Sequence, residues 1–164
     1  MSDPQSSPPR TAITLCGSLR KDSINEVLRR HMSMKLREAG VSVTDIDLNE
    51  FEMPIFNQDI EDAGDTPEAA KRLADIFRTT DIVLIISPEY NGGVPPLVVN
   101  VVAWLSRQKP QSFLEDTKVA IISRSPLVSV FGPRSSTSAS SRIGLAVAGL
   151  KAKALVIPGN SGGS

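Results

Sequence analysis

The chain has 164 residues, of which 40% are hydrophobic and 22% charged, proportions typical of one soluble globular domain. Its 18 Lys and Arg balance its 18 Asp and Glu, so no overall charge attracts nucleic acid or an anionic membrane, and we expect neither as a partner. One Cys and one His exclude an internal disulfide and a multi-Cys or multi-His metal site, and they indicate a reducing compartment, the cytoplasm.

Residues 1–10 are polar and Pro-rich without the apolar core of a signal peptide, and we expect a disordered tail followed by a single domain over 11–164. Apolar runs predict strands at 11–17, 41–48, 81–87, 117–123 and 153–159. Helix-start signals and helical spacing predict helices beginning at Ser23, Thr66 and Pro95, and another near Ser140 to Leu150. This alternation of buried strands and helices predicts an α/β fold with a doubly wound, five-stranded parallel sheet.

The first helix has a polar start and an apolar face. Ser23 with Glu26 three places on matches a capping box, and Gly40 supplies the stop. Five apolar residues recur at helical spacing and are expected to face the core: Ile24, Val27, Leu28, Met32 and Leu36.

Two polar loops follow predicted strands, "GSLRKDSIN" over 17–25 and "SPEYNGG" over 87–93. In the flavodoxin-like strand order 2-1-3-4-5 the first and third strands are neighbours, so both loops would meet at the edge where ligands bind. The first loop offers hydroxyls, backbone N–H groups and the Arg20 guanidinium at a helix N-terminus, which favours a phosphate. The bland alternatives are a simple helix cap at Ser23 and a solvated Arg20, and no P-loop or G-x-G-x-x-G motif decides between them.

The second loop suits a planar ligand. Pro88 stiffens the exit from the strand, while Asn91, Gly92 and Gly93 permit positive φ and a close approach to the backbone. Backbone N–H groups there could bond the rim of a heterocycle beside Tyr90. A tight turn with an incidental Tyr explains the loop about equally well.

Taken together, the two motifs resemble those of the NADPH-dependent FMN reductase family, which includes quinone, azo-dye and chromate reductases with a flavodoxin-like fold. The family patterns G-S-x-R-x-x-S-x-N and P-E-Y-N-G, the latter followed by a helix ending W-L-S-R, both occur here, and "MPIFNQDIE" is similar to the family's P-L-Y-N-x-D connection. The resemblance implies FMN as cofactor and NADPH or NADH as hydride donor. It places the FMN phosphate on Ser18, Arg20, Ser23 and Asn25, and the ring and ribityl chain on Pro88, Glu89, Tyr90, Asn91 and Gly92. A third contact loop would begin at Ser123.

Two places depart from the family pattern. Val99 and Ala103 stand where the family usually has a Lys and an Asp four residues apart. Residues 124–141 lack the family's Gly-Gly-Arg type turn, with only Gly132 and Arg134 hinting at it.

The resemblance implies hydride transfer from NAD(P)H through FMN to a small acceptor such as a quinone, azo compound, metal oxyanion or free flavin. That chemistry belongs to the cofactor, so no catalytic side chain is assigned. The alternatives are a non-catalytic flavodoxin-like flavin-binding or regulatory module, and a one-electron carrier, which the zero net charge disfavours. An apolar region of Val98, Val99, Val102 and Ala103 leads us to expect a homodimer or a tetramer.

Other conspicuous residues have simpler explanations. Cys16 is expected in the core, Trp104 in the core or at a subunit interface, and His31 at the edge of a buried stripe. The acidic cluster of Asp59, Glu61, Asp62 and Asp65 is expected to be a solvated loop rather than a metal site.

Overall fold

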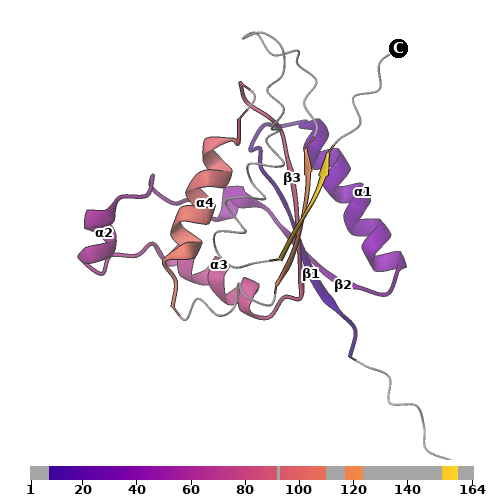
Figure 1. Cartoon of the computed structure of the whole chain (residues 1–164), viewed down its shortest axis with the longest axis horizontal. Helices are drawn as coiled ribbons and strands as arrows, with labels where there is room; N and C mark the ends of the chain where they lie inside the picture. Colours follow the sequence, from indigo (N-terminus) through magenta and orange to yellow (C-terminus); the bar gives the residue numbers. More distant parts are fainter. Residues whose placement is uncertain (1–7, 92, 110–116, 124–152, 159–164) are drawn as a thin grey trace, which may run out of the picture.

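The structure is a computed structural model, which describes residues 8–91, 93–109, 117–123 and 153–158 (Figure 1). Along the chain the strands are β1 (Thr11–Cys16), β2 (Ser42–Ile46), β3 (Ile82–Ser87), β4 (Lys118–Ser123) and β5 (Lys153–Pro158). The helices are α1 (Ile24–Glu38), the short 3-10 turn η1 (Leu48–Glu50), α2 (Gln58–Asp62), α3 (Glu68–Arg78) and α4 (Pro96–Ser106).

The strands form a parallel sheet in which β2, β1, β3 and β4 lie side by side in this order. β5 is paired with β4 in the same direction. Four successive residues of β3, Val83 to Ile86, are buried, because helices cover both faces of the sheet. The α/β class and the parallel sheet predicted from the sequence are confirmed.

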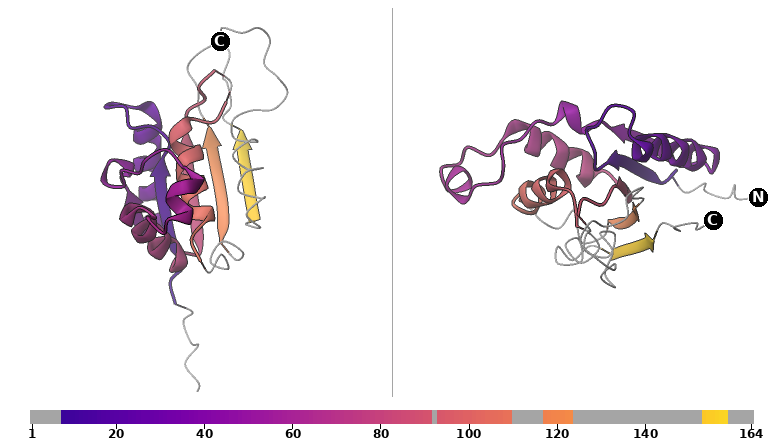
Figure 2. Two further views of the ribbon diagram at one scale, coloured as in Figure 1. Left: turned by 90° about the vertical axis from the view of Figure 1, so that its left-hand side faces the viewer. Right: turned by 90° about the horizontal axis from the view of Figure 1, so that it is seen from above.

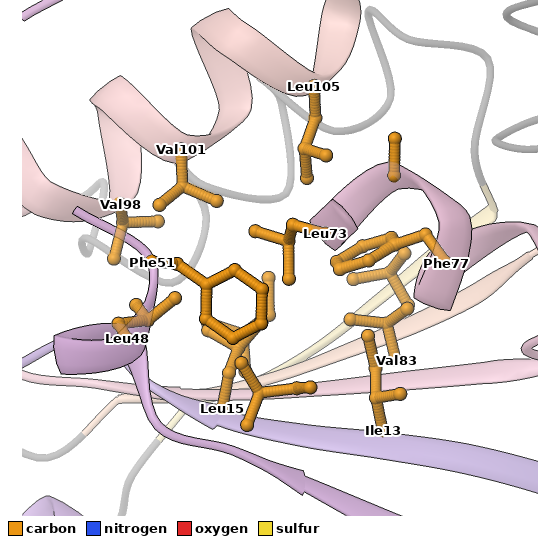
Figure 3. Packing of buried hydrophobic residues seen from close by; sticks show 14 of the residues in the cluster. Ile13, Leu15, Leu48, Phe51, Leu73, Phe77, Val83, Val98, Val101 and Leu105 are labelled. Atoms are coloured by element: carbon orange, nitrogen blue, oxygen red, sulfur yellow. The ribbon is translucent and has the colours of Figure 1, made fainter. Parts of the chain in front are cut away.

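The helices form two layers around the sheet. α1 lies on one face, and α3 and α4 lie together on the other, with α2 projecting beyond them (Figures 1 and 2). The main apolar core fills the space between the sheet and the α3–α4 layer, where Phe77 of α3 and Val101 of α4 point toward Leu15 and Val83 of the strands (Figure 3). Trp104 is fully buried, as expected.

The element bounds differ slightly from the sequence prediction. β2 ends at Ile46 rather than Leu48, because the Asp47 carboxylate accepts the N–H of Asn49 at 2.9 Å and turns the chain into η1. α3 has Pro67, not Thr66, as its N-cap. The predicted helix at 140–150 lies outside the described residues.

The predicted apolar face of α1 is only partly correct, since Leu28, Met32 and Leu36 are partly buried but the other two residues are not. Ile24 is exposed, and so is Val27, at 65%. The buried residues of α1 are instead polar, namely Asn25, Arg29 and Ser33. The reason lies on the sheet, where Thr14 of β1 and Asp45 of β2 are register partners and their oxygens accept hydrogen bonds from Arg29. Polar groups on the strands therefore select the polar face of the helix.

Candidate functional site

The two polar loops meet in space. Because β1 and β3 are parallel neighbours, the loops that follow them lie at the same edge of the sheet. The hydroxyl groups of Ser18 in the first loop and Tyr90 in the second are 3.4 Å apart. Residues 72 positions apart in sequence thus line one site at the carboxyl ends of two strands.

A close approach at Gly17 holds the first loop against the end of β3. The Gly17 N–H donates to the Ile86 carbonyl at 2.8 Å. A Cβ at position 17 would lie 2.5 Å from the Ser87 Oγ and 2.6 Å from the Val98 Cγ2, far inside normal contact distances. Only glycine fits here, so the loop starts from a fixed position directly above the β3–α4 junction.

The capping box expected at the start of α1 does not form. Ser23 is the N-cap residue, but its side chain makes no capping hydrogen bond. The Glu26 carboxylate instead accepts hydrogen bonds from Arg29 and Arg30. The interpretation of Ser23 as a simple side-chain cap is therefore wrong. The Glu26 N–H donates to the Ser23 carbonyl at 3.0 Å, and among the described residues the N–H groups of Ile24 and Asn25 are left for an anion.

Three of the predicted phosphate residues differ in their surroundings. Arg20 is exposed, its backbone N–H donates to the Ser18 Oγ at 3.3 Å, and its guanidinium reaches the Asp22 carbonyl at 3.4 Å. Ser23 is buried beside Cys16. Burial raises the pKa of the Cys16 thiol, which keeps the thiol protonated and matches the expected core role.

Asn25 gives a direct sign of a missing partner. Its side chain lies in a residue that is 4% exposed, and its Oδ1 has no hydrogen-bond partner within the described part of the chain. A buried unpaired acceptor costs free energy, and native structures rarely tolerate one. A phosphate has no donor for this oxygen, but a 180° flip of the amide would present Nδ2, which can donate to a phosphate, at the N-terminus of α1.

The second loop is closed on itself. The N–H of Tyr90 donates to the Gly93 carbonyl at 3.1 Å, and the N–H of Gly93 returns a bond of 2.8 Å to the Tyr90 carbonyl. Asn91 adopts the positive φ predicted for this turn, at 52°. Pro88 is buried and Glu89 partly buried, while Tyr90 is half exposed. Gly92 lies outside the described residues.

A third strand end reaches the same edge. Ser123, the last residue of β4, is the register partner of Ser87 at the end of β3. Its backbone position is therefore next to the second loop. The segment that follows, 124–141, lies outside the described residues.

The remaining candidates stay apart from this site. His31 is exposed rather than at the edge of a buried stripe, because the buried stripe of α1 runs through Arg29 and Ser33 instead. Asp59 and Glu61 lie in α2, and within the described ranges no group of three or more His, Cys, Asp or Glu side chains could hold a metal ion. No described helix has the length and apolar character needed to cross a membrane.

Two residues that shape the site were not predicted from the sequence. Ser87 is completely buried and makes the close contact with Gly17, and Arg29 holds the carboxylate of Glu26. Arg29 could have been found from its position four residues after Asn25, because residues at this spacing lie on the same face of a helix.

The sequence is similar to that of known proteins over most of its length. A sequence profile described as NADPH-dependent FMN reductase matches residues 11–149, which include both loops. A quinone reductase of Pseudomonas putida is 36% identical over 110 residues, which are 67% of this chain and 57% of the relative. A quinone reductase of Escherichia coli is 34% identical over 99 residues, 60% of this chain and 52% of the relative. The chain thus spans a little over half the length of these curated relatives.

Among solved structures, a flavoenzyme NAD(P)H:(acceptor) oxidoreductase from Paracoccus denitrificans superposes with a TM-score of 0.68 and 26% sequence identity, covering 89% of this chain and 75% of that one. An azoreductase from Bacillus anthracis superposes with a TM-score of 0.64 and 19% identity, covering 91% and 86% of the two chains. The second likeness concerns the fold alone.

Proposed function

Because the chain belongs to the NADPH-dependent FMN reductase family, we propose that it is an NAD(P)H-dependent flavin oxidoreductase. It passes a hydride from NADPH or NADH through FMN to a small acceptor such as a quinone, azo compound, metal oxyanion or free flavin. The relatives named as quinone reductases make a quinone the first acceptor to test.

The observation that carries the proposal is the contact between the two loops. Ser18 and Tyr90 bring a polar helix N-terminus without a side-chain cap within reach of a turn closed by two backbone hydrogen bonds. The first element suits a phosphate and the second a planar ring, as FMN would require. The Asn25 amide, whose Oδ1 has no partner among the described residues and whose Nδ2 could face a phosphate after a flip, and the close packing at Gly17 fit a bound cofactor at this edge.

We assign the residues to two parts of the cofactor. The phosphate is bound by the first group, Ser18, Arg20, Ser23 and Asn25. The ring and ribityl chain are held by the second group, Pro88, Glu89, Tyr90, Asn91 and Gly92, with Ser123 opening a third contact.

When bound, FMN supplies the hydride-accepting and hydride-donating chemistry. The protein binds the phosphate at the end of α1 and orients the ring through the closed turn at Tyr90 and Gly93. No side chain is needed as a general acid or base, so none is proposed as catalytic.

Several broader features complete the proposal. The domain spans 11–164 and has the flavodoxin-like order 2-1-3-4-5, which the pairing of β5 with β4 supports. The protein acts in the cytoplasm and forms a homodimer or a tetramer. Of the apolar residues expected at an interface, Val99 is exposed, Val102 and Ala103 are partly buried, and Val98 is buried in the core against Gly17, so Val98 is withdrawn from that surface.

The test is a titration of the purified protein with FMN, followed by NADPH under anaerobic conditions and then a quinone. We expect saturable binding, bleaching of the visible flavin absorbance by NADPH, and its return when the quinone is added. Binding without bleaching would favour the non-catalytic flavin-binding module. Absence of binding with FMN in excess would refute the proposal.

A further inference from the structure

The buried polar face of α1 is centred on one guanidinium. The Arg29 side chain is 9% exposed, and each of its three nitrogens has an acceptor. Nε and Nη2 form a fork with Glu26 at 2.8 and 2.7 Å. Nη1 donates to the Thr14 Oγ1 at 2.9 Å and to the Asp45 Oδ1 at 2.5 Å. Arg29 therefore ties the first turn of α1 to both β1 and β2.

Glu26 is the unusual partner in this cluster. It is the third residue of α1, in the turn whose N–H groups would receive a phosphate. A carboxylate at that end is itself favoured by the helix dipole, but its charge opposes a second anion there. The hydrogen bond from Arg29 lowers the pKa of Glu26, against the opposing effect of partial burial, so the carboxylate is ionised at neutral pH and must be compensated.

The partners of the two carboxylates are not equivalent. Without Arg29, Asp45 would keep hydrogen bonds from Ser33, Thr14 and Arg37. Among the residues that the structure describes, Glu26 would keep only its bond from Arg30, whose side chain is 75% exposed and therefore screened by water. Removing the Arg29 guanidinium would therefore leave the negative charge of Glu26, the carboxylate nearest to the phosphate end of the helix, less compensated than that of Asp45.

We propose that Arg29 is a positioning residue for the FMN phosphate. It holds the Glu26 carboxylate against the side of α1 and neutralises its charge. The N-terminus of the helix, with Ser23 and Asn25, can then bind the phosphate dianion of FMN. This inference rests on the proposed function, since it concerns the same cofactor.

The experiment compares FMN with riboflavin, which lacks only the phosphate. Dissociation constants for both flavins are measured by quenching of flavin fluorescence, and folding by thermal unfolding, for the full chain and its variants. We expect Arg29→Met to raise the Kd of FMN by about two- to fivefold relative to riboflavin, the effect of one charge near a helix end. The double variant Glu26→Gln with Arg29→Met should regain FMN affinity, because the uncompensated carboxylate is gone.

A matched control distinguishes the local effect of Arg29 on FMN affinity from the effect of losing one positive charge anywhere on the protein. Lys35→Met removes one positive charge from the exposed far end of the same helix, where Lys35 pairs with Glu38 at 2.8 Å. It should leave the Kd values of both flavins unchanged. An equal loss of FMN affinity in this variant would overturn the proposal, since any lost cation would then suffice.

Other outcomes are equally decisive. Equal weakening of FMN and riboflavin in Arg29→Met, or no recovery in the double variant, would leave Arg29 a purely structural role and overturn the inference. If Arg29→Met does not unfold cooperatively, Arg29→Lys is used, because it keeps the charge and loses the fork. It should preserve the FMN-to-riboflavin ratio within about twofold, and a lost ratio overturns the inference. Failure of the unmodified chain to bind either flavin refutes the proposed function itself, and this inference with it.

Discussion

Gly17 offers the sharpest test of how the first loop is held. Substitution by Ala places a methyl group 2.5 Å from the Ser87 Oγ, 2.6 Å from the Val98 Cγ2 and 2.9 Å from the Ser87 Cβ. Contacts between carbon atoms are favourable at about 3.5–4.0 Å, so the loop or its neighbours must move apart by roughly 1 Å. Both neighbours are buried, and the bond from the Gly17 N–H to the Ile86 carbonyl resists displacement of the loop.

Overpacking of this kind costs about 1–3 kcal/mol, which for a chain of this length lowers the unfolding temperature by about 2–4 °C per kcal/mol. Because the loop can relieve the clash only by moving away from β3, we also expect FMN to bind several times more weakly. Urea denaturation and FMN titration of Gly17→Ala measure the two effects.

A second glycine provides the control. Gly64 has a φ of 79° and nothing within 4 Å of an added Cβ, so Gly64→Ala introduces backbone strain of about 1–2 kcal/mol without a clash. It should destabilise the protein and leave FMN affinity unchanged. Unchanged stability and unchanged FMN binding in Gly17→Ala would refute the close approach of the loop to β3.

Four further expectations follow from single contacts. Trp104→Phe removes the bond from the indole Nε1 to the Pro54 carbonyl, 2.8 Å long, and should lower the free energy of unfolding by about 1–3 kcal/mol in urea. Although burial opposes it, hydrogen bonds from neighbouring side chains hold the pKa of Asp45 well below its usual range. The stability that Asp45 contributes should therefore be fully present above the ordinary carboxyl pKa and should be lost as the pH falls below about 5. When unfolding is followed against pH, Asp45→Asn should lose less stability in acid than the unmodified chain. The buried, protonated thiol of Cys16 should react with a thiol reagent only after denaturation, and rapid labelling of the folded protein would contradict this. Asn25→Ala should weaken FMN binding with little loss of stability, because its Oδ1 is unpaired within the described residues, and equal FMN affinity would remove Asn25 from the site.

The sequence alone was enough to predict the α/β class and both loops. Buried parallel strands require continuous apolar runs, and the run at 82–86 has no other simple explanation. Loop chemistry is also local, because a positive φ at Asn91 depends on the residue itself and its immediate neighbours.

Only the tertiary structure decided what each polar residue does. Ser23 and Glu26 have the spacing of a capping box, but the Glu26 carboxylate binds Arg29 instead. Arg29 is held in place there by Thr14 and Asp45, which belong to two different strands. The apolar periodicity of α1 did not identify its most deeply buried face for the same reason, because Thr14 and Asp45 lie opposite that face and bond Arg29. The sequence thus determined the strands, the helices α1, α3 and α4 and the two polar loops, but not η1 or α2. The pairing of strands distant in sequence, which no local pattern encodes, decides the rest. It produces the contact between Ser18 and Tyr90, the surroundings of the Asn25 side chain and the hydrogen bonds of Arg29 to Glu26, Thr14 and Asp45.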